Sequence, residues 1–180
     1  MPRVSKEQAK INRQRVVEVA AGLFRERGLH GVGVVDIMAA AGMTHGGFYG
    51  QFANKDALAA EAFDVALAEE NRGTTNTVVA NYLSLGHVKS PGRGCPLAAL
   101  ANDVSREAPD SLVRARFTRG VEGLAALIAG LTPKASKERR RRRALATTAT
   151  LVGAVVLARA VDDEELANEL LQAAQDSVMS

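Results

Sequence analysis

The chain has 180 residues, 47% of them hydrophobic and 24% charged, with a net charge of +3; these values are typical of a soluble globular protein of one or two small domains. They exclude disordered, collagen-like and mucin-like chains. No stretch approaches the roughly 18 uninterrupted apolar residues of a membrane span. Residues 144–158 come nearest, and we expect no membrane partner. The lack of an apolar segment at the N-terminus and the single cysteine, Cys95, both predict a cytoplasmic protein.

Positive charge is concentrated before Val16, where five basic residues stand against one acidic residue, Glu7. This excess predicts contact with a polyanion at that end of the chain, although a solvated helix face has the same composition. The basic residues are Arg3, Lys6, Lys10, Arg13 and Arg15.

Apolar residues recur at helical spacing along almost the whole chain, which predicts an all-α fold of about nine helices. Ser5-x-x-Gln8 is typical of a capping box at the start of the first helix, which ends near Gly28. The apolar stripe that this helix buries consists of Val16, Ala20, Leu23 and Phe24. Further helices are predicted at 34–41, 45–51, 55–72, 76–88, 96–107, 111–130, 137–160 and 163–177.

Residues 34–52 contain the most informative pattern, two short predicted helices separated by Gly42-Met43-Thr44. Gly42 can adopt the left-handed conformation that a sharp turn needs, and Met43 can fill the corner. Phe48 and Phe52 are four residues apart and would anchor the second helix on the core. A helix-turn-helix is therefore predicted, in which the residues facing the DNA are His45, Gly46, Tyr49 and Gly50.

This part of the chain resembles the TetR family of bacterial transcriptional regulators. The resemblance covers about a quarter of the chain, and its anchors fall in order at the family's spacing. They are Arg15-Val-Val-Glu-Val-Ala-Ala-Gly-Leu-Phe24, Gly28, Asp36-Ile37, Ala41-Gly42, Phe48-Tyr49, Phe52 and Lys55-Asp56-Ala57-Leu58.

The resemblance implies a DNA-binding domain at residues 1–54 and a ligand-binding and dimerisation domain at 55–180. It also implies that Tyr49 and Lys55 contact phosphate and that Thr44 lies at the N-terminus of the recognition helix. Phosphate contacts set the register on DNA, whereas base contacts set sequence preference. The expected DNA-binding set is Thr44, His45, Gly46, Gly47, Tyr49, Gln51 and Lys55.

Two adjacent glycines, Gly46 and Gly47, are unusual in so short a helix, because each costs roughly 1 kcal/mol relative to Ala. We interpret them as allowing the backbone to approach the floor of the DNA groove, so that specificity rests on His45, Gln51 and DNA shape. The alternative is that they are turn-like glycines that the fold tolerates.

Three aromatic residues of the C-terminal part, Phe63, Tyr82 and Phe117, are candidates for the lining of a ligand pocket, with core packing as the alternative. By the resemblance, the last two helices pair with their copies in a homodimer. The arginine run 139–143 could contact DNA, but its residues point all around a helix, so a solvated face or pairing with the acidic run 162–165 is favoured.

Cys95 precedes Pro96 at a predicted helix start, where free N–H groups and the helix dipole would stabilise a thiolate. It is a candidate sensor of oxidants or electrophiles. The alternative is a buried cysteine that only packs.

The sequence contains no motif that indicates an enzyme. Ser90-Pro-Gly-Arg-Gly lacks the Gly-Lys-Ser/Thr ending of a phosphate-binding loop, and the histidines have no metal-ligand spacing. We therefore predict no catalytic residue, no metal and no cofactor. The expected function is a ligand-inducible repressor that binds a palindromic operator in double-stranded DNA as a homodimer, with an unknown small-molecule inducer. The alternative is a small-molecule, oxidant or electrophile sensor whose DNA-binding head is vestigial.

Overall fold

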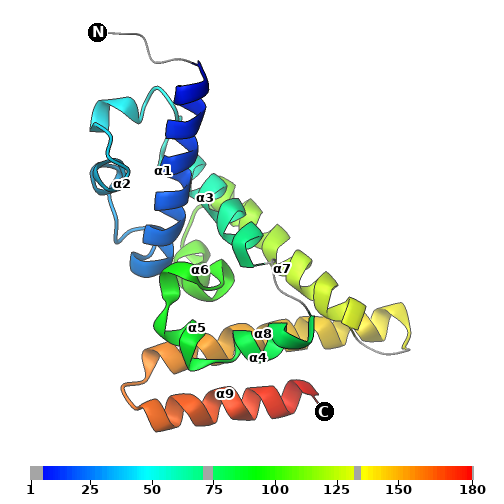
Figure 1. Cartoon of the computed structure of the whole chain (residues 1–180). Coiled ribbons are helices and arrows are strands. Elements are labelled where there is room, and N and C mark those ends of the chain that lie inside the picture. Colours follow the sequence, from blue (N-terminus) through cyan, green and yellow to red (C-terminus); the bar gives the residue numbers. More distant parts are fainter. Residues whose placement is uncertain (1–5, 71–74, 132–134, 180) are drawn as a thin grey trace.

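The computed structural model describes residues 6–70, 75–131 and 135–179, and the regular structure of these residues is entirely helical (Figure 1). They form nine α-helices and two 3-10 turns, so the predicted all-α fold is confirmed. The predicted capping box at Ser5 lies outside the described residues.

The N-terminal head consists of α1 (Lys6–Arg27), α2 (Val34–Ala40), the 3-10 turn η1 (His45–Gly47) and the first part of α3 (Lys55–Glu70). The stripe predicted for α1 is buried at Val16, Ala20 and Phe24, whereas Leu23 is only partly buried. Gly28, at φ 78°, ends α1 in the left-handed conformation that glycine adopts without strain.

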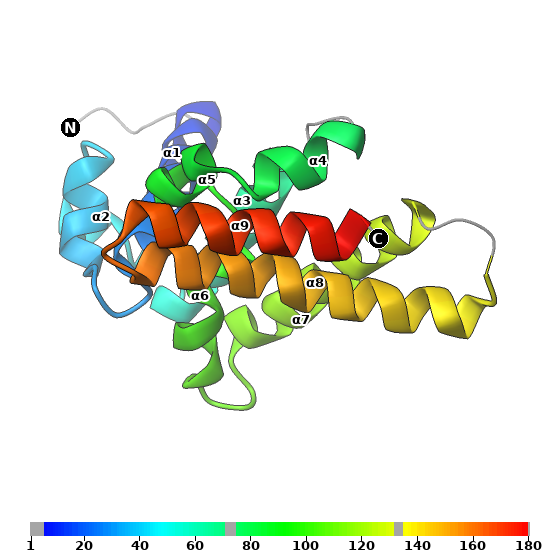
Figure 2. The same ribbon diagram turned by 90° about the horizontal axis from the view of Figure 1, so that it is seen from below.

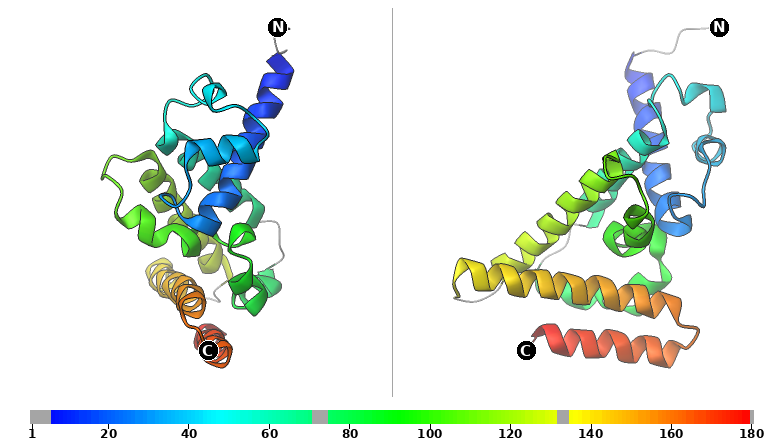
Figure 3. Two further views of the ribbon diagram at one scale, coloured as in Figure 1. Left: turned by 90° about the vertical axis from the view of Figure 1, so that its left-hand side faces the viewer. Right: turned by 180° about the vertical axis from the view of Figure 1, so that it is seen from behind.

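The rest of the described chain, including the second half of α3, forms a helical body below the head. Its elements are α4 (Thr75–Tyr82), α5 (Leu85–Lys89), the 3-10 turn η2 (Pro91–Arg93), α6 (Pro96–Ser105), α7 (Leu112–Leu131), α8 (Lys137–Ala160) and α9 (Glu164–Met179). The antiparallel pair α8 and α9 forms a layer at the end opposite to the head (Figures 2 and 3). The one helix predicted at 76–88 is wrong: α4 ends at Tyr82, and the Ser84 hydroxyl accepts the His87 N–H at 3.2 Å, which starts α5 as a new helix.

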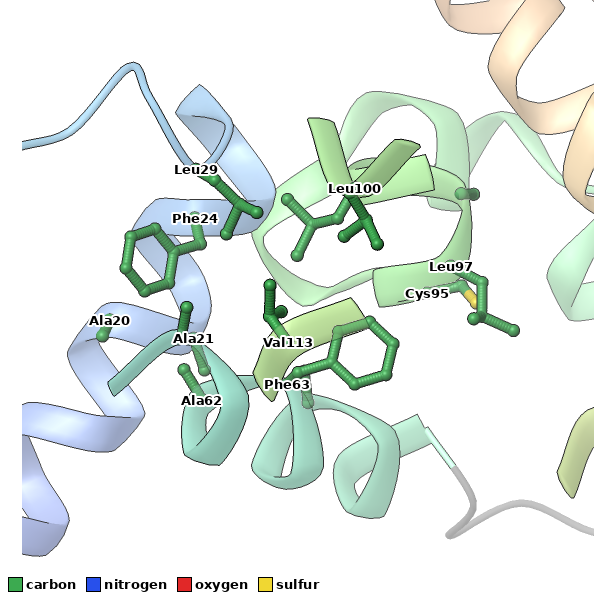
Figure 4. Packing of buried hydrophobic residues seen from close by; sticks show 14 of the residues in the cluster. Ala20, Ala21, Phe24, Leu29, Ala62, Phe63, Cys95, Leu97, Leu100 and Val113 are labelled. Carbon is green, nitrogen blue, oxygen red and sulfur yellow. The ribbon is translucent and has the colours of Figure 1, made fainter. Parts of the chain in front are cut away.

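Head and body share one hydrophobic core across residue 54, where the sequence predicts a domain boundary. Phe24 and Leu29 of the head belong to the same buried cluster as Phe63 of α3, Leu100 of α6 and Val113 of α7 (Figure 4). Because the core is continuous, the head and the body are held together by packed side chains. The division at 54/55 stays a prediction.

Of the described helices, α8 is long and apolar enough to cross a membrane by length and composition alone, which the sequence analysis did not expect of any segment. In this structure 33% of the most apolar 18-residue stretch of α8 is buried. One face packs on α7 and α9, and Leu157 on the other face is 52% exposed. The arginine run lies at the start of α8 and the acidic run 162–165 follows its end. At the rise per residue of an α-helix the two are roughly 30 Å apart, so the predicted pairing of the two runs within one chain is wrong.

Candidate nucleic-acid interface

The segment predicted as a recognition helix, residues 45–51, is instead a 3-10 turn followed by an irregular turn. Gly47 N–H donates to the Thr44 carbonyl at 3.0 Å, and Phe48 N–H donates to that of His45 at 3.0 Å. Thr44 is the N-cap residue, but its side chain makes no capping hydrogen bond. The predicted helix is wrong because Gly46, Gly47 and Gly50 together remove a few kcal/mol of helix propensity. We call residues 44–51 the 44–51 turn.

Two buried phenylalanines fix the 44–51 turn to the head, as the sequence predicts. The rings of Phe48 and Phe52 stack with their centroids 5.5 Å apart, and both residues belong to the core. Tyr49, in contrast, is 68% exposed and is held edge-on by the rings of Phe48 at 5.2 Å and His45 at 5.6 Å. The turn therefore presents the Tyr49 hydroxyl to solvent from a rigid base.

The backbone conformation requires glycine at position 42, whereas the space around positions 46 and 47 would accept a side chain. Gly42 has φ 74°, so the predicted left-handed turn between the two segments is confirmed. A Cβ at Gly46 would have no heavy atom within 4 Å, and one at Gly47 would make ordinary contact with Met38 Cε at 3.5 Å. Local packing therefore does not require glycine at position 46 or 47.

The predicted DNA-binding residues lie along one stretch but differ in exposure. Thr44, His45, Gly46 and Tyr49 are exposed, and Gly47, Gln51 and Lys55 are half-buried. Gln51 folds back on the turn, where its Nε2 donates to the Gly47 carbonyl at 3.0 Å and its Oε1 is buried without a hydrogen bond. Lys55 Nζ lies 5.9 Å from the centre of the Phe24 ring.

Sequence reasoning missed the role of Arg13, which it counted among the basic residues at the N-terminus. The guanidinium of Arg13 forms a two-pronged ion pair with Glu61 of α3, at 2.6 Å for each N–O pair. It also donates to the Gln51 carbonyl at 3.4 Å and lies over the Phe52 ring, 4.6 Å from its centroid. The hydrogen bonds and charge of Glu61 raise the pKa of Arg13. No local pattern pairs residues 13 and 61, which are 48 positions apart.

Three acidic side chains join head and body. Asp56, in the first turn of α3, accepts hydrogen bonds from the Ser111 hydroxyl at 2.7 Å and from Leu112 N–H at 2.9 Å and Val113 N–H at 3.2 Å, and so caps α7. Asp103 of α6 accepts Leu29 N–H at 2.6 Å.

The third acid, Glu107, pairs with His30 at 2.8 Å. A cavity of about 140 Å³ lies at this junction and is lined by Leu29, His30, Lys55, Asp56, Ala59, Glu107 and Val113.

The pocket residues predicted in the body are buried or half-buried. Phe63 and Phe117 contact each other with centroids 5.7 Å apart, and Tyr82 contacts the His87 ring at 4.7 Å. Burial, the largest cause, and the nearby charge of Arg159 lower the pKa of His87, while a hydrogen bond to the Tyr82 carbonyl acts in the opposite direction. The lining of a ligand pocket by these aromatic residues stays a prediction.

Cys95 is the N-cap residue of α6 and precedes Pro96 at its start, as the sequence predicts. Its N–H donates to His87 Nε2 at 2.9 Å. The residue is 1% exposed and lies beside Leu97 and Phe63 (Figure 4). A sensor role requires reagent to reach a thiol that is buried in this conformation, and it stays a prediction.

Part of the chain is similar in sequence to known regulators. Residues 16–62 match the family model described as bacterial regulatory proteins, tetR family. A 73-residue stretch is 36% identical to the HTH-type transcriptional regulator AcrR of Shigella flexneri; it covers 41% of this chain and only 33% of that protein.

Solved structures extend the likeness of fold to nearly the whole chain. E. coli NemR in its reduced form is 20% identical, with a TM-score of 0.73 over 93% of this chain and 95% of that one. A TetR-family regulator from Cytophaga hutchinsonii is 21% identical, with a TM-score of 0.73 over 99% and 97%. A TetR regulator from Chloroflexus aurantiacus is 25% identical, with a TM-score of 0.69 over 96% and 94%.

Proposed function

We propose that this chain belongs to the TetR family of bacterial transcriptional regulators and that it represses transcription by binding a palindromic operator in double-stranded DNA as a homodimer. Proteins of this family are regulators and not enzymes. An unidentified small molecule binds the body and releases the DNA. The protein acts in the cytoplasm, where operator and inducer meet.

The observation that carries the proposal is the 44–51 turn. It offers an exposed hydroxyl at Tyr49 and an exposed imidazole at His45, both supported from below by the buried pair Phe48 and Phe52. A rigid base with short exposed side chains suits contact with phosphates and base edges. The glycines at 46 and 47 leave room for the backbone to come close to the groove.

The dimer is supported by the outer face of α8 and α9. Large apolar side chains are exposed there on both helices, although their opposite faces are packed in the body. A second copy of this face is the occupant that the proposal requires, because an operator with two half-sites needs two heads. The exposed residues are Leu145, Val156, Leu157 and Leu166.

The contacts between head and body support release of DNA by ligand. A ligand among Phe63, Tyr82 and Phe117 would shift α6 or α7, and these helices hold the head through Asp56 and Asp103. A ligand that binds the shifted state more tightly moves the population toward heads that are spaced wrongly for DNA.

Selection of bound fragments from a random double-stranded DNA pool tests the proposal. We expect enriched fragments to share an inverted repeat with half-sites about one helical turn, ~34–36 Å, or more apart. Two protomers should bind each fragment, and affinity should fall steeply with salt. A folded dimer that enriches no sequence would overturn the proposal and favour the sensor with a vestigial head.

A further inference from the structure

We propose that Arg13 is a positioning residue that holds the 44–51 turn in its DNA-reading conformation, and that it is not one of the phosphate contacts of the basic N-terminal segment. This inference rests on the proposed function, and it assigns to one basic residue a role opposite to the one its charge suggests.

The contacts of Arg13 converge on the end of the turn. Its guanidinium lies over Phe52, 4.6 Å from the ring centroid, and donates to the carbonyl of Gln51. Its two terminal nitrogens are held by the two carboxylate oxygens of Glu61 on α3. One side chain thus joins α1, the turn and α3, and the planar fork of arginine is the group that can stack and bond in this way.

The turn needs such a brace because its own sequence stabilises it poorly. It contains three glycines, forms a 3-10 turn in place of an α-helix, and its N-cap residue Thr44 gives no side-chain bond. Its last residues are held by two backbone hydrogen bonds to the Phe48 carbonyl, from Gln51 at 2.9 Å and Phe52 at 3.0 Å. Arg13 contacts the turn at this same end, at the Gln51 carbonyl and the Phe52 ring.

The same contacts argue against a phosphate role for Arg13. Its charge is already matched by a carboxylate in the strongest geometry that the pair allows. Contact with phosphate would compete with Glu61 for the guanidinium, so Arg13 should release fewer counterions from DNA than an unpaired arginine would. Arg15, two residues further along α1, is exposed and has no hydrogen bond or ion pair shown among the described residues, which makes it a matched control.

The test compares Arg13→Gln, Glu61→Gln and Arg15→Gln on a selected DNA fragment and on random DNA across a range of salt. We expect Arg13→Gln and Glu61→Gln each to weaken binding to the selected fragment by about tenfold or more. The salt slope should stay within about 0.3 of the wild type per head, against a loss of about 0.9 for each phosphate contact removed. Binding to random DNA should change little. Arg15→Gln measures the effect of charge loss alone.

Glu61→Gln separates the two roles most sharply. If Arg13 positions the turn, releasing it from Glu61 weakens specific binding. If Arg13 contacts phosphate, removing the neighbouring negative charge strengthens binding to any DNA. Tighter binding by Glu61→Gln, a salt slope lowered by Arg13→Gln, or unchanged specific affinity in Arg13→Gln would each overturn the inference.

A second measurement does not depend on DNA. Amide hydrogen exchange at Gln51 and Phe52 should accelerate at least about tenfold in Arg13→Gln and Glu61→Gln, and not in Arg15→Gln, because only the first two release the turn. A general loss of fold would instead accelerate exchange along α1 and α3. Wild-type protein that selects no DNA would refute the proposed function alone; unaltered exchange at the turn would refute the positioning role.

Discussion

Asp56 provides the most direct test of how the head is attached to the body. Its carboxylate caps α7 with one hydroxyl and two backbone N–H donors, although it belongs to α3. Removal of a helix cap costs about 0.5–2 kcal/mol, and the residue is half-buried, so we expect Asp56→Ala to lower the free energy of unfolding by about 1–2 kcal/mol. For a chain of this length that corresponds to a fall in Tm of about 2–8 °C.

The assay is thermal and urea unfolding followed by far-UV circular dichroism at one fixed protein concentration, since the proposed dimerisation would make Tm depend on concentration. Asp110→Ala is the matched control, because Asp110 is exposed next to Ser111 and has no hydrogen bond shown among the described residues. Equal stability of Asp56→Ala and wild type, or an equal loss in Asp110→Ala, would refute the capping argument.

Four further predictions concern other parts of the chain. Burial holds the pKa of His87 below its ordinary value of 6.5, so neutral His87 stabilises the fold fully above pH 6.5 and this stabilisation is lost as the pH falls through the lowered pKa. Between about pH 7.5 and about pH 5.5, the free energy of unfolding in urea should therefore fall more in wild type than in His87→Gln. Gly47→Gln should keep the circular dichroism spectrum and weaken specific DNA binding by about tenfold or more if the backbone approaches the groove, and unchanged binding would refute that approach. Leu157→Arg should dissociate the proposed dimer in sedimentation experiments, whereas Leu112→Arg, at a residue 51% exposed and outside the α8–α9 face, should not. Cys95 should react with a thiol reagent far more slowly in native than in urea-unfolded protein, and fast native reaction with loss of DNA binding that Cys95→Ser prevents would favour the sensor role.

The fold was predictable wherever the apolar pattern was long. The helices at residues 6–27, 112–131, 137–160 and 164–179 follow from apolar spacing, because their burial repeats along many turns. About nine helices were expected and nine are described, but two of the expected helices differ from those in the structure. The 44–51 turn replaced one expected helix, and the pair α4 and α5 replaced another.

Both differences have local causes that were present in the sequence. Gly46, Gly47 and Gly50 weaken an α-helix by a few kcal/mol, and Phe48 and Phe52 are buried without one, so their burial does not favour the helix over the turn. Ser84 is a good N-cap residue inside the predicted helix 76–88, where it begins a new one.

The contacts that bind the elements together could not be predicted from spacing. Arg13 and Glu61 are 48 residues apart, and Asp56 and Ser111 are 55 apart. Sequence patterning reports which residues share a face of one helix, but it carries no information on which distant polar group satisfies another. Arg13 was therefore counted as a free positive charge, although most of its donors are used within the head.

Binding of one selected operator by wild type and by Tyr49→Ala tests the central claim, that the 44–51 turn reads DNA, most directly. Tyr49 is exposed and outside the core, so its truncation leaves the fold intact. Leu112→Ala, at a similarly exposed residue, serves as the control. The account predicts that Tyr49→Ala loses about tenfold or more in affinity for the operator while Leu112→Ala binds as wild type does. Equal operator affinity in all three proteins would contradict it.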